Sequence, residues 1–173
     1  MTVKPIDKIT LLAESVATNN GVRLYDLELV GVGHGKILRV YIDKDDPAGV
    51  SLDDCSNVSR GLSLLLDVED PISGSYNLEV SSPGLERVLK QKWHYERSVG
   101  REICIQLKKH LGKIVTDIPT AMASRKKLLG VLVSADDNEI EMEIGVESKL
   151  KLSMDNVVKA NWVFNYEKNF GKN

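Results

Sequence analysis

Residues 23–43, RLYDLELVGVGHGKILRVYID, contain two runs of alternating apolar and polar residues on either side of a glycine-rich segment. In the first run Tyr25, Leu27 and Leu29 alternate with acidic residues, and the second run, Lys36 to Asp43, alternates in the same way. A period of two is typical of strands with one buried face, and a short glycine-rich connection is typical of a β-hairpin. The stretch therefore predicts two antiparallel strands that form the centre of a small sheet.

Helical patterns lie on both sides of this hairpin. Residues 4–20 carry apolar side chains at three- and four-residue steps, and Asn20-Gly21 supplies a left-handed stop. Downstream, Ser51 is expected to cap a second helix, with Asp54 completing an imperfect capping box. A third strand follows at residues 76–80. The order α-β-β-α-β predicts a two-layer α+β domain with both helices on one face of the sheet and a second, partly polar face open to solvent or a partner.

The second half of the chain predicts a different architecture. Short alternating or apolar runs occur at residues 101–107, 128–134, 139–144, 148–152 and 158–163, and Ser153 is placed to cap a single helical turn before the last run. Short strands at such close spacing, joined by tight turns, are typical of a small β-barrel. We therefore expect two domains, residues 1–92 and residues 93–173.

Charge is distributed unevenly over these two parts. The net charge of the chain is −2, but residues 1–96 carry 10 Lys+Arg against 15 Asp+Glu, whereas residues 97–173 carry 13 against 10. The segment 108–127 contains a single acid, Asp117, and is expected to be a mobile loop that either contacts phosphates or is a solvated insertion. Its basic residues are Lys108, Lys109, His110, Lys113, Arg125, Lys126 and Lys127.

A second basic series surrounds the expected domain junction. Trp93 and Tyr95 lie among these cations, so the rings either stack on unpaired bases or pack across the junction. The cations of this series are expected to position a phosphate backbone. They are Arg87, Lys90, Lys92, Arg97 and Arg101.

Several classes of function find no support in the sequence. The glycine-rich segment leads into a strand rather than a helix and lacks the GxGxxG spacing, so we do not expect nucleotide binding there, and His34 at its tip is expected to be an exposed loop histidine. Cys55 and Cys104 are too few for a thiolate metal site. No nucleophile has a recognisable base, no pair of acids stands out, and no apolar run is long enough to span a bilayer. We therefore expect a soluble, cytoplasmic protein without catalysis, metal or cofactor.

Three separated motifs carry a resemblance. They are LRVYID at residues 38–43, SLDDC at residues 51–55 followed by Ser59-Arg60, and SSPGLER at residues 81–87, in which the Pro-Gly pair predicts a tight turn. In this order and spacing they resemble the bacterial ribosome maturation factor RimP family. The match runs through most of residues 5–90, and residues 97–173 match more loosely.

The resemblance implies a first domain with KH-like architecture and a second domain that is an SH3-like (Sm-like) barrel. It further implies a non-catalytic monomer, without a small-molecule substrate or membrane attachment, that binds the free 30S small ribosomal subunit during late assembly. The implied partners are 16S rRNA and small-subunit ribosomal protein number twelve. Residues 1–90 contain no GXXG loop, so the KH likeness is architectural only. The turn motif matched is Ser82, Pro83, Gly84 and Glu86, within SSPGLER.

Two other functions remain open from sequence. One is a protein-binding adaptor whose barrel recognises a peptide or ribosomal protein without contacting RNA. The other is a small-ligand enzyme on the first domain, which would need a deep pocket with convergent polar groups.

Overall fold

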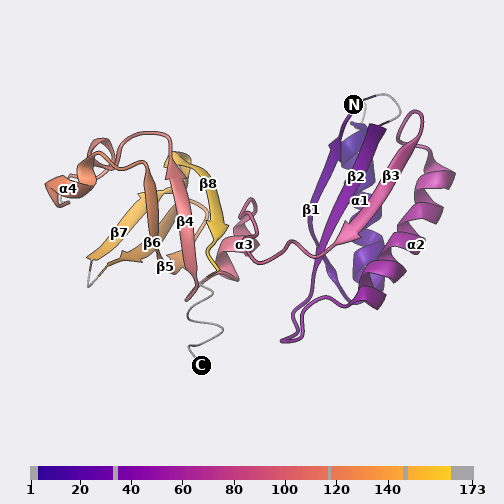
Figure 1. Ribbon diagram of the computed structural model, residues 1–173, viewed down its shortest axis with the longest axis horizontal. Helices are drawn as coiled ribbons and strands as arrows, with labels where there is room; N and C mark the ends of the chain where they lie inside the picture. Colours follow the sequence, from indigo (N-terminus) through magenta and orange to yellow (C-terminus); the bar gives the residue numbers. More distant parts are fainter. Residues whose placement is uncertain (1–3, 33–34, 117, 146–147, 165–173) are drawn as a thin grey trace. The chain divides into compact units, whose positions relative to one another are not determined.

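The computed structural model describes residues 4–32, 35–116, 118–145 and 148–164, so that His34 and Asp117 lie outside the described residues. The chain divides into two compact units between Pro83 and Gly84 (Figure 1). Among the described residues, no helix combines the length and apolar character that a bilayer crossing requires.

The first unit confirms the predicted order of elements: α1 (Pro5–Asn19), β1 (Arg23–Val30), β2 (Lys36–Asp43), α2 (Leu52–Glu69) and β3 (Tyr76–Ser81). Its strands form one sheet in the order β1-β2-β3. β1 and β2 form the predicted antiparallel hairpin, whereas β3 lies parallel to β2. α2 is the crossover connection that a parallel pair of strands needs.

Both helices cover the same face of this sheet, as predicted, because a single buried core joins them to the strands. On α2, Gly61 marks where the helices approach closely, since a Cβ atom there would lie 3.0 Å from a methyl group of Val16 on α1. The core is formed by Ile9, Ala13, Val16, Ala17, Val22, Leu24, Leu38, Val40, Ile42, Val58, Leu62, Leu66 and Ile72.

The first strand departs from the predicted alternation at Tyr25. Leu24 pairs with Ile42 and Asp26 with Tyr41, so the register shifts between Leu24 and Asp26. In such a β-bulge two residues of one strand oppose one residue of its partner. Leu24 therefore joins the core cluster and Tyr25, although buried, does not. The prediction that Tyr25 shares the face of Leu27 is wrong because strict alternation does not continue through a bulge.

The second helix begins with a complete capping box rather than an imperfect one. The Ser51 Oγ atom accepts the N–H of Asp54 at 3.1 Å, and the Asp54 carboxylate accepts the N–H of Ser51 at 2.9 Å. These bonds, first from the Ser51 backbone and then from its side chain, hold the pKa of Asp54 below its usual value, and Lys44 contributes at 3.2 Å. The cap satisfies N–H groups that have no partner within the helix.

The second unit is a largely antiparallel sheet with short helical turns. Its elements are α3 (Lys92–Glu96), β4 (Glu102–Leu107), η2 (Leu111–Lys113), α4 (Thr120–Ala123), β5 (Lys127–Ala135), β6 (Glu139–Ile144), β7 (Ser148–Ser153), η3 (Met154–Asn156) and β8 (Val157–Trp162). All five predicted strands are present, in the order β7-β6-β5-β4-β8, and every pairing is antiparallel. The predicted Ser153 cap is also present, since its Oγ atom accepts the Asp155 N–H at 3.3 Å.

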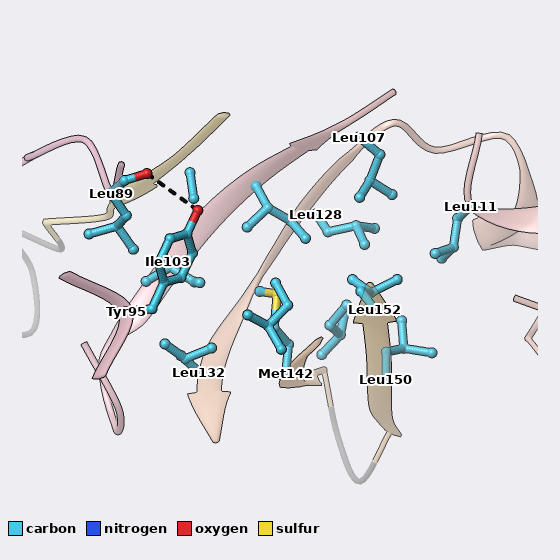
Figure 2. Close-up of a cluster of buried hydrophobic side chains, with 14 residues drawn as sticks. Leu89, Tyr95, Ile103, Leu107, Leu111, Leu128, Leu132, Met142, Leu150 and Leu152 are labelled. Atoms are coloured by element: carbon cyan, nitrogen blue, oxygen red, sulfur yellow. Dashed lines mark hydrogen bonds between the residues drawn. The ribbon is translucent and has the colours of Figure 1, made fainter. Parts of the chain in front are cut away.

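All five strands direct side chains into a single core, which we call the second core. The sheet must therefore curve around this core. Tyr95 of α3 points into this core, and its hydroxyl donates to the carbonyl oxygen of Leu89 at 3.3 Å (Figure 2). Burial raises the pKa of this phenol. The fully buried strand residues are Ile103, Ile105, Leu132, Met142 and Ala160.

The segment that follows the Pro-Gly turn belongs to the second unit. The N–H of Leu89 donates to the carbonyl oxygen of Ala160 at 2.8 Å, and the N–H of Trp162 donates to the carbonyl oxygen of Arg87 at 3.0 Å. Residues 87–89 therefore lie along β8. The units therefore divide before the boundary predicted between residues 92 and 93. In the predicted turn Gly84 has φ of +78°, as expected for the glycine of a Pro-Gly turn.

Candidate nucleic-acid interface

The described residues of the segment between β4 and β5, 108–116 and 118–126, are folded, which corrects the prediction of a mobile loop. Leu111 is fully buried in the second core, and its N–H donates to the carbonyl oxygen of Arg125 at 2.8 Å. Gly112 lies so close to Ala123 that a Cβ atom at residue 112 would be 2.9 Å from the Ala123 methyl group. The prediction relied on the lack of a sustained hydrophobic periodicity in this segment. One buried leucine and two short helical turns order the segment without producing such a pattern. The segment also packs Ile114, Val115, Ile118 and Met122 against the core.

This folding brings the two ends of the segment together. The N–H of Leu107 donates to the carbonyl oxygen of Lys126 at 2.7 Å, and the register places Gln106 opposite Lys127. Cations that are distant in sequence therefore meet at one end of the sheet. We call this set the loop cations: Lys108, Lys109, Lys113, Arg125, Lys126 and Lys127.

The positive charges of the loop cations are not paired with a described carboxylate. All six are exposed, and none forms an ion pair with another described residue. His110, in the same segment, is differently placed: its Nδ1 atom lies 2.6 Å from the Ser124 carbonyl oxygen. Because a carbonyl oxygen only accepts, Nδ1 must carry the proton in this contact. His110 thus helps to hold the segment closed.

The basic series around the expected domain junction differs from the loop cations, because Arg87, Lys92 and Arg101 are engaged within the second unit. Lys92 lies 2.8 Å from the Asp137 carboxylate and 4.0 Å from that of Glu96, and the hydrogen bond to Asp137 is the main reason that its pKa is raised. Lys90 and Arg97 also have interaction partners.

Arg87 and Arg101 of the same series stack on an aromatic ring. The guanidinium carbon of each lies 4.2 Å from the centroid of the Trp162 ring, a cation–π distance. Arg87 additionally donates from Nε to the Gly84 carbonyl oxygen at 3.1 Å. These side chains therefore fix residues 87–101 to β8, whereas the loop cations are exposed and form no ion pair with a described residue.

The two junction rings also have local roles. Tyr95 is part of the second core, and Trp93 donates from its ring nitrogen to the Gln91 side chain at 2.7 Å. Between them, His94 accepts the backbone N–H groups of Lys90 and Gln91 on Nδ1, at 3.0 and 3.2 Å. His94 is thus a buried cap of α3, a role that the sequence could have suggested only if α3 had been predicted.

Sequence reasoning missed one cation beside the loop cations. Lys159 of β8 lies opposite Gln106 of β4, which lies opposite Lys127 of β5 on its other side. Lys159 is exposed and, like the loop cations, forms no ion pair with a described residue. The alternation that places Lys159 on one face of β8 was visible in the sequence. The strand that pairs with β8 was not.

The described part of the first unit contains one surface groove that could hold a small ligand. The groove, of about 610 Å³, lies between α2 and β3 and is lined by Leu52, Cys55, Ser56, Ser59, Arg60 and Val80. This lining includes no carboxylate and no histidine that could act as a general base. Burial raises the pKa of the Cys55 thiol, which disfavours the nucleophilic thiolate. Within the described ranges, no three His, Cys, Asp or Glu residues gather as metal ligands would.

A comparison with known families completes the description of the first unit. A sequence model of the RimP N-terminal domain matches residues 12–86, which span most of α1 and all of β1, β2, α2 and β3. The motifs at residues 38–43 and 51–55 lie within this match, and the motif at residues 81–87 does so except for its last residue, Arg87. The first unit is therefore similar to the RimP N-terminal domain, and this match supports membership of the RimP family of ribosome maturation factors.

Proposed function

We propose that this protein is a non-catalytic, monomeric assembly factor that binds the free 30S small ribosomal subunit in the cytoplasm. In this proposal the loop cations contact the phosphates of 16S rRNA. The first unit has the KH-like architecture that its α-β-β-α-β order and parallel β2–β3 pair support. The second is an SH3-like barrel, which its curved five-stranded antiparallel sheet supports.

The observation that carries the proposal is the set of six exposed loop cations without an acidic partner among the described residues. Each cation that neutralises a phosphate releases a condensed counterion, and this release drives binding at moderate salt. The excess of acids in the first half of the chain opposes phosphate binding there and suits a basic ribosomal protein. Binding that favours one rRNA conformation over others would assist assembly without a chemical step.

The test is binding of the full chain to purified free 30S subunits over a range of salt concentrations. We compare the double variant Lys126→Gln/Lys127→Gln with the charge-matched control Lys149→Gln/Lys151→Gln. The control lysines are exposed on β7, opposite Glu143 and Glu141 of β6. If Lys126 and Lys127 each contact one phosphate, the slope of log K against log salt should decrease in magnitude by about 1.4 to 1.8. Binding near 0.1 M salt should then be weaker by roughly 25- to 60-fold.

The control variant should bind like the wild-type chain. Salt-independent binding, or equal effects of the two variants, would reject the RNA contact and leave the protein-binding adaptor as the better description. A chain that does not co-sediment with free subunits at any salt concentration would reject the proposal as a whole.

A further inference from the structure

The outer face of the second sheet separates its charges into two regions. On β6 and β7, Glu141 lies opposite Lys151 and Glu143 opposite Lys149, so each lysine faces a carboxylate. Opposite charges at directly facing positions stabilise a strand pair. These lysines are therefore explained by the fold itself and need no ligand.

The row across β8, β4 and β5 has a different composition. Lys159, Gln106 and Lys127 stand at facing positions, all three are exposed, and neither lysine has an ion-pair partner among the described residues. The nearest acid in sequence, Asp155 on η3, forms no ion pair with either. Neighbouring strands lie about 4.8 Å apart, so the backbones of the two lysines are separated by roughly 10 Å.

Two cations at this separation repel each other weakly and do not stabilise the fold. In water their repulsion is about 0.4 kcal/mol, which the fold tolerates but which does not favour it. The separation is also about one Debye length at 0.1 M salt, so Lys159 adds to the potential of the loop cations beside Lys127. Gln106, between the lysines, provides an amide that can donate to a phosphate oxygen.

We propose that the RNA-binding surface continues from the loop cations across the outer face of β5, β4 and β8 to Lys159. The ligand is a polynucleotide backbone, because a row of separated cations with a neutral donor between them matches successive phosphates better than one small anion. This inference rests on the proposed function, since it extends the same surface. Lys159 is thereby assigned as an RNA-contacting residue on a strand that follows the basic segment by some thirty residues in sequence.

The experiment measures binding of the full chain to a fluorescein-labelled single-stranded RNA, (U)16, by anisotropy between 50 and 300 mM KCl. Three variants are compared: Lys159→Gln, Lys127→Gln and the control Lys151→Gln. For a single-strand contact, Lys159→Gln should decrease the magnitude of the salt slope by about 0.7, which is roughly fivefold weaker binding at 0.1 M. Lys151→Gln should leave the slope unchanged, and all variants should retain the thermal transition of the wild-type chain.

The outcomes separate this inference from the proposal on which it rests. An unchanged slope for Lys159→Gln with a reduced slope for Lys127→Gln would overturn the extension to β8 only. Unchanged slopes for both would overturn RNA binding at this surface. Displacement of the RNA by 5 mM inorganic phosphate at constant ionic strength would indicate a single-phosphate site and would also overturn the polynucleotide assignment.

Discussion

The substitution Gly130→Ala tests how closely the second sheet is packed. A Cβ atom built on Gly130 of β5 would lie 2.3 Å from the carbonyl oxygen of Glu143 and 3.1 Å from a side-chain carbon of Ile144, both on β6. Ordinary contact begins near 3.4 Å, so β5 and β6 must separate by about 1.1 Å. β6 is held by β7 on its far side and cannot move alone. Overpacking of this kind costs typically 1–3 kcal/mol, and a weakened ladder bond adds about 1 kcal/mol.

We therefore expect Gly130→Ala to lower the free energy of unfolding of the second unit by about 3 kcal/mol, or its melting temperature by roughly 12–24 °C. Both tryptophans of the chain, Trp93 and Trp162, lie in the second unit, so tryptophan fluorescence reports on that unit alone. The helices α1 and α2 lie in the first unit, and far-ultraviolet circular dichroism should show that its transition is unchanged.

The control for this experiment is Gly35→Ala, because a Cβ atom at residue 35 would meet nothing within 4 Å and no left-handed φ is involved. Because Gly35 lies in the first unit, this control should leave the circular dichroism transition of that unit in place. A melting temperature for Gly130→Ala within 2 °C of the wild-type value would refute the reasoning, since β5 and β6 would then have room that their described backbone positions do not provide.

Three further predictions concern single side chains. Leu111→Ala should cost the second unit about 2–5 kcal/mol in the same fluorescence assay, because Leu111 is fully buried, and a loss below 1 kcal/mol would contradict its place in the core. Ser51→Ala should cost the first unit about 1 kcal/mol in urea unfolding followed by circular dichroism. Because the pKa of Asp54 is lowered in the folded state, its stabilisation is present above about pH 4 and is lost as pH falls through that lowered pKa. Ser51→Ala removes the side-chain hydrogen bond but keeps the backbone N–H, so it should reduce this acid-side dependence without abolishing it. Tyr95 should ionise above the usual pH range of tyrosine in an absorbance titration at 295 nm, and ionisation in the ordinary range would contradict its burial.

Local patterns were sufficient to predict the strands of both units and the two helices of the first unit. A period of two requires only neighbouring residues, so β1, β2 and all five strands of the second unit were predictable. The Ser51 cap was predictable for the same reason, because its partner Asp54 is three residues away.

Features that depend on distant contacts were not predictable in this way. The bulge at Tyr25, the parallel position of β3 and the pairing of residues 87–89 with β8 are set by packing between segments far apart in sequence. The candidate site shows the same division. Composition identified the loop cations, but only the strand register places Lys159 beside them, and only the ion pair to Asp137 removes Lys92 from the accessible set.

The buried Leu111 has a consequence for recognition. Ordering one residue of a flexible chain costs about 1–2 kcal/mol of conformational entropy. Leu111 and its hydrogen bond to Arg125 order the segment between β4 and β5 when the chain folds. The conformational entropy of this segment is therefore lost during folding and not when a ligand binds. A preorganised set of charges loses less conformational entropy when it binds a partner. Its charges also have a fixed spatial arrangement. A ligand with the wrong phosphate geometry then cannot recruit the segment by reshaping it.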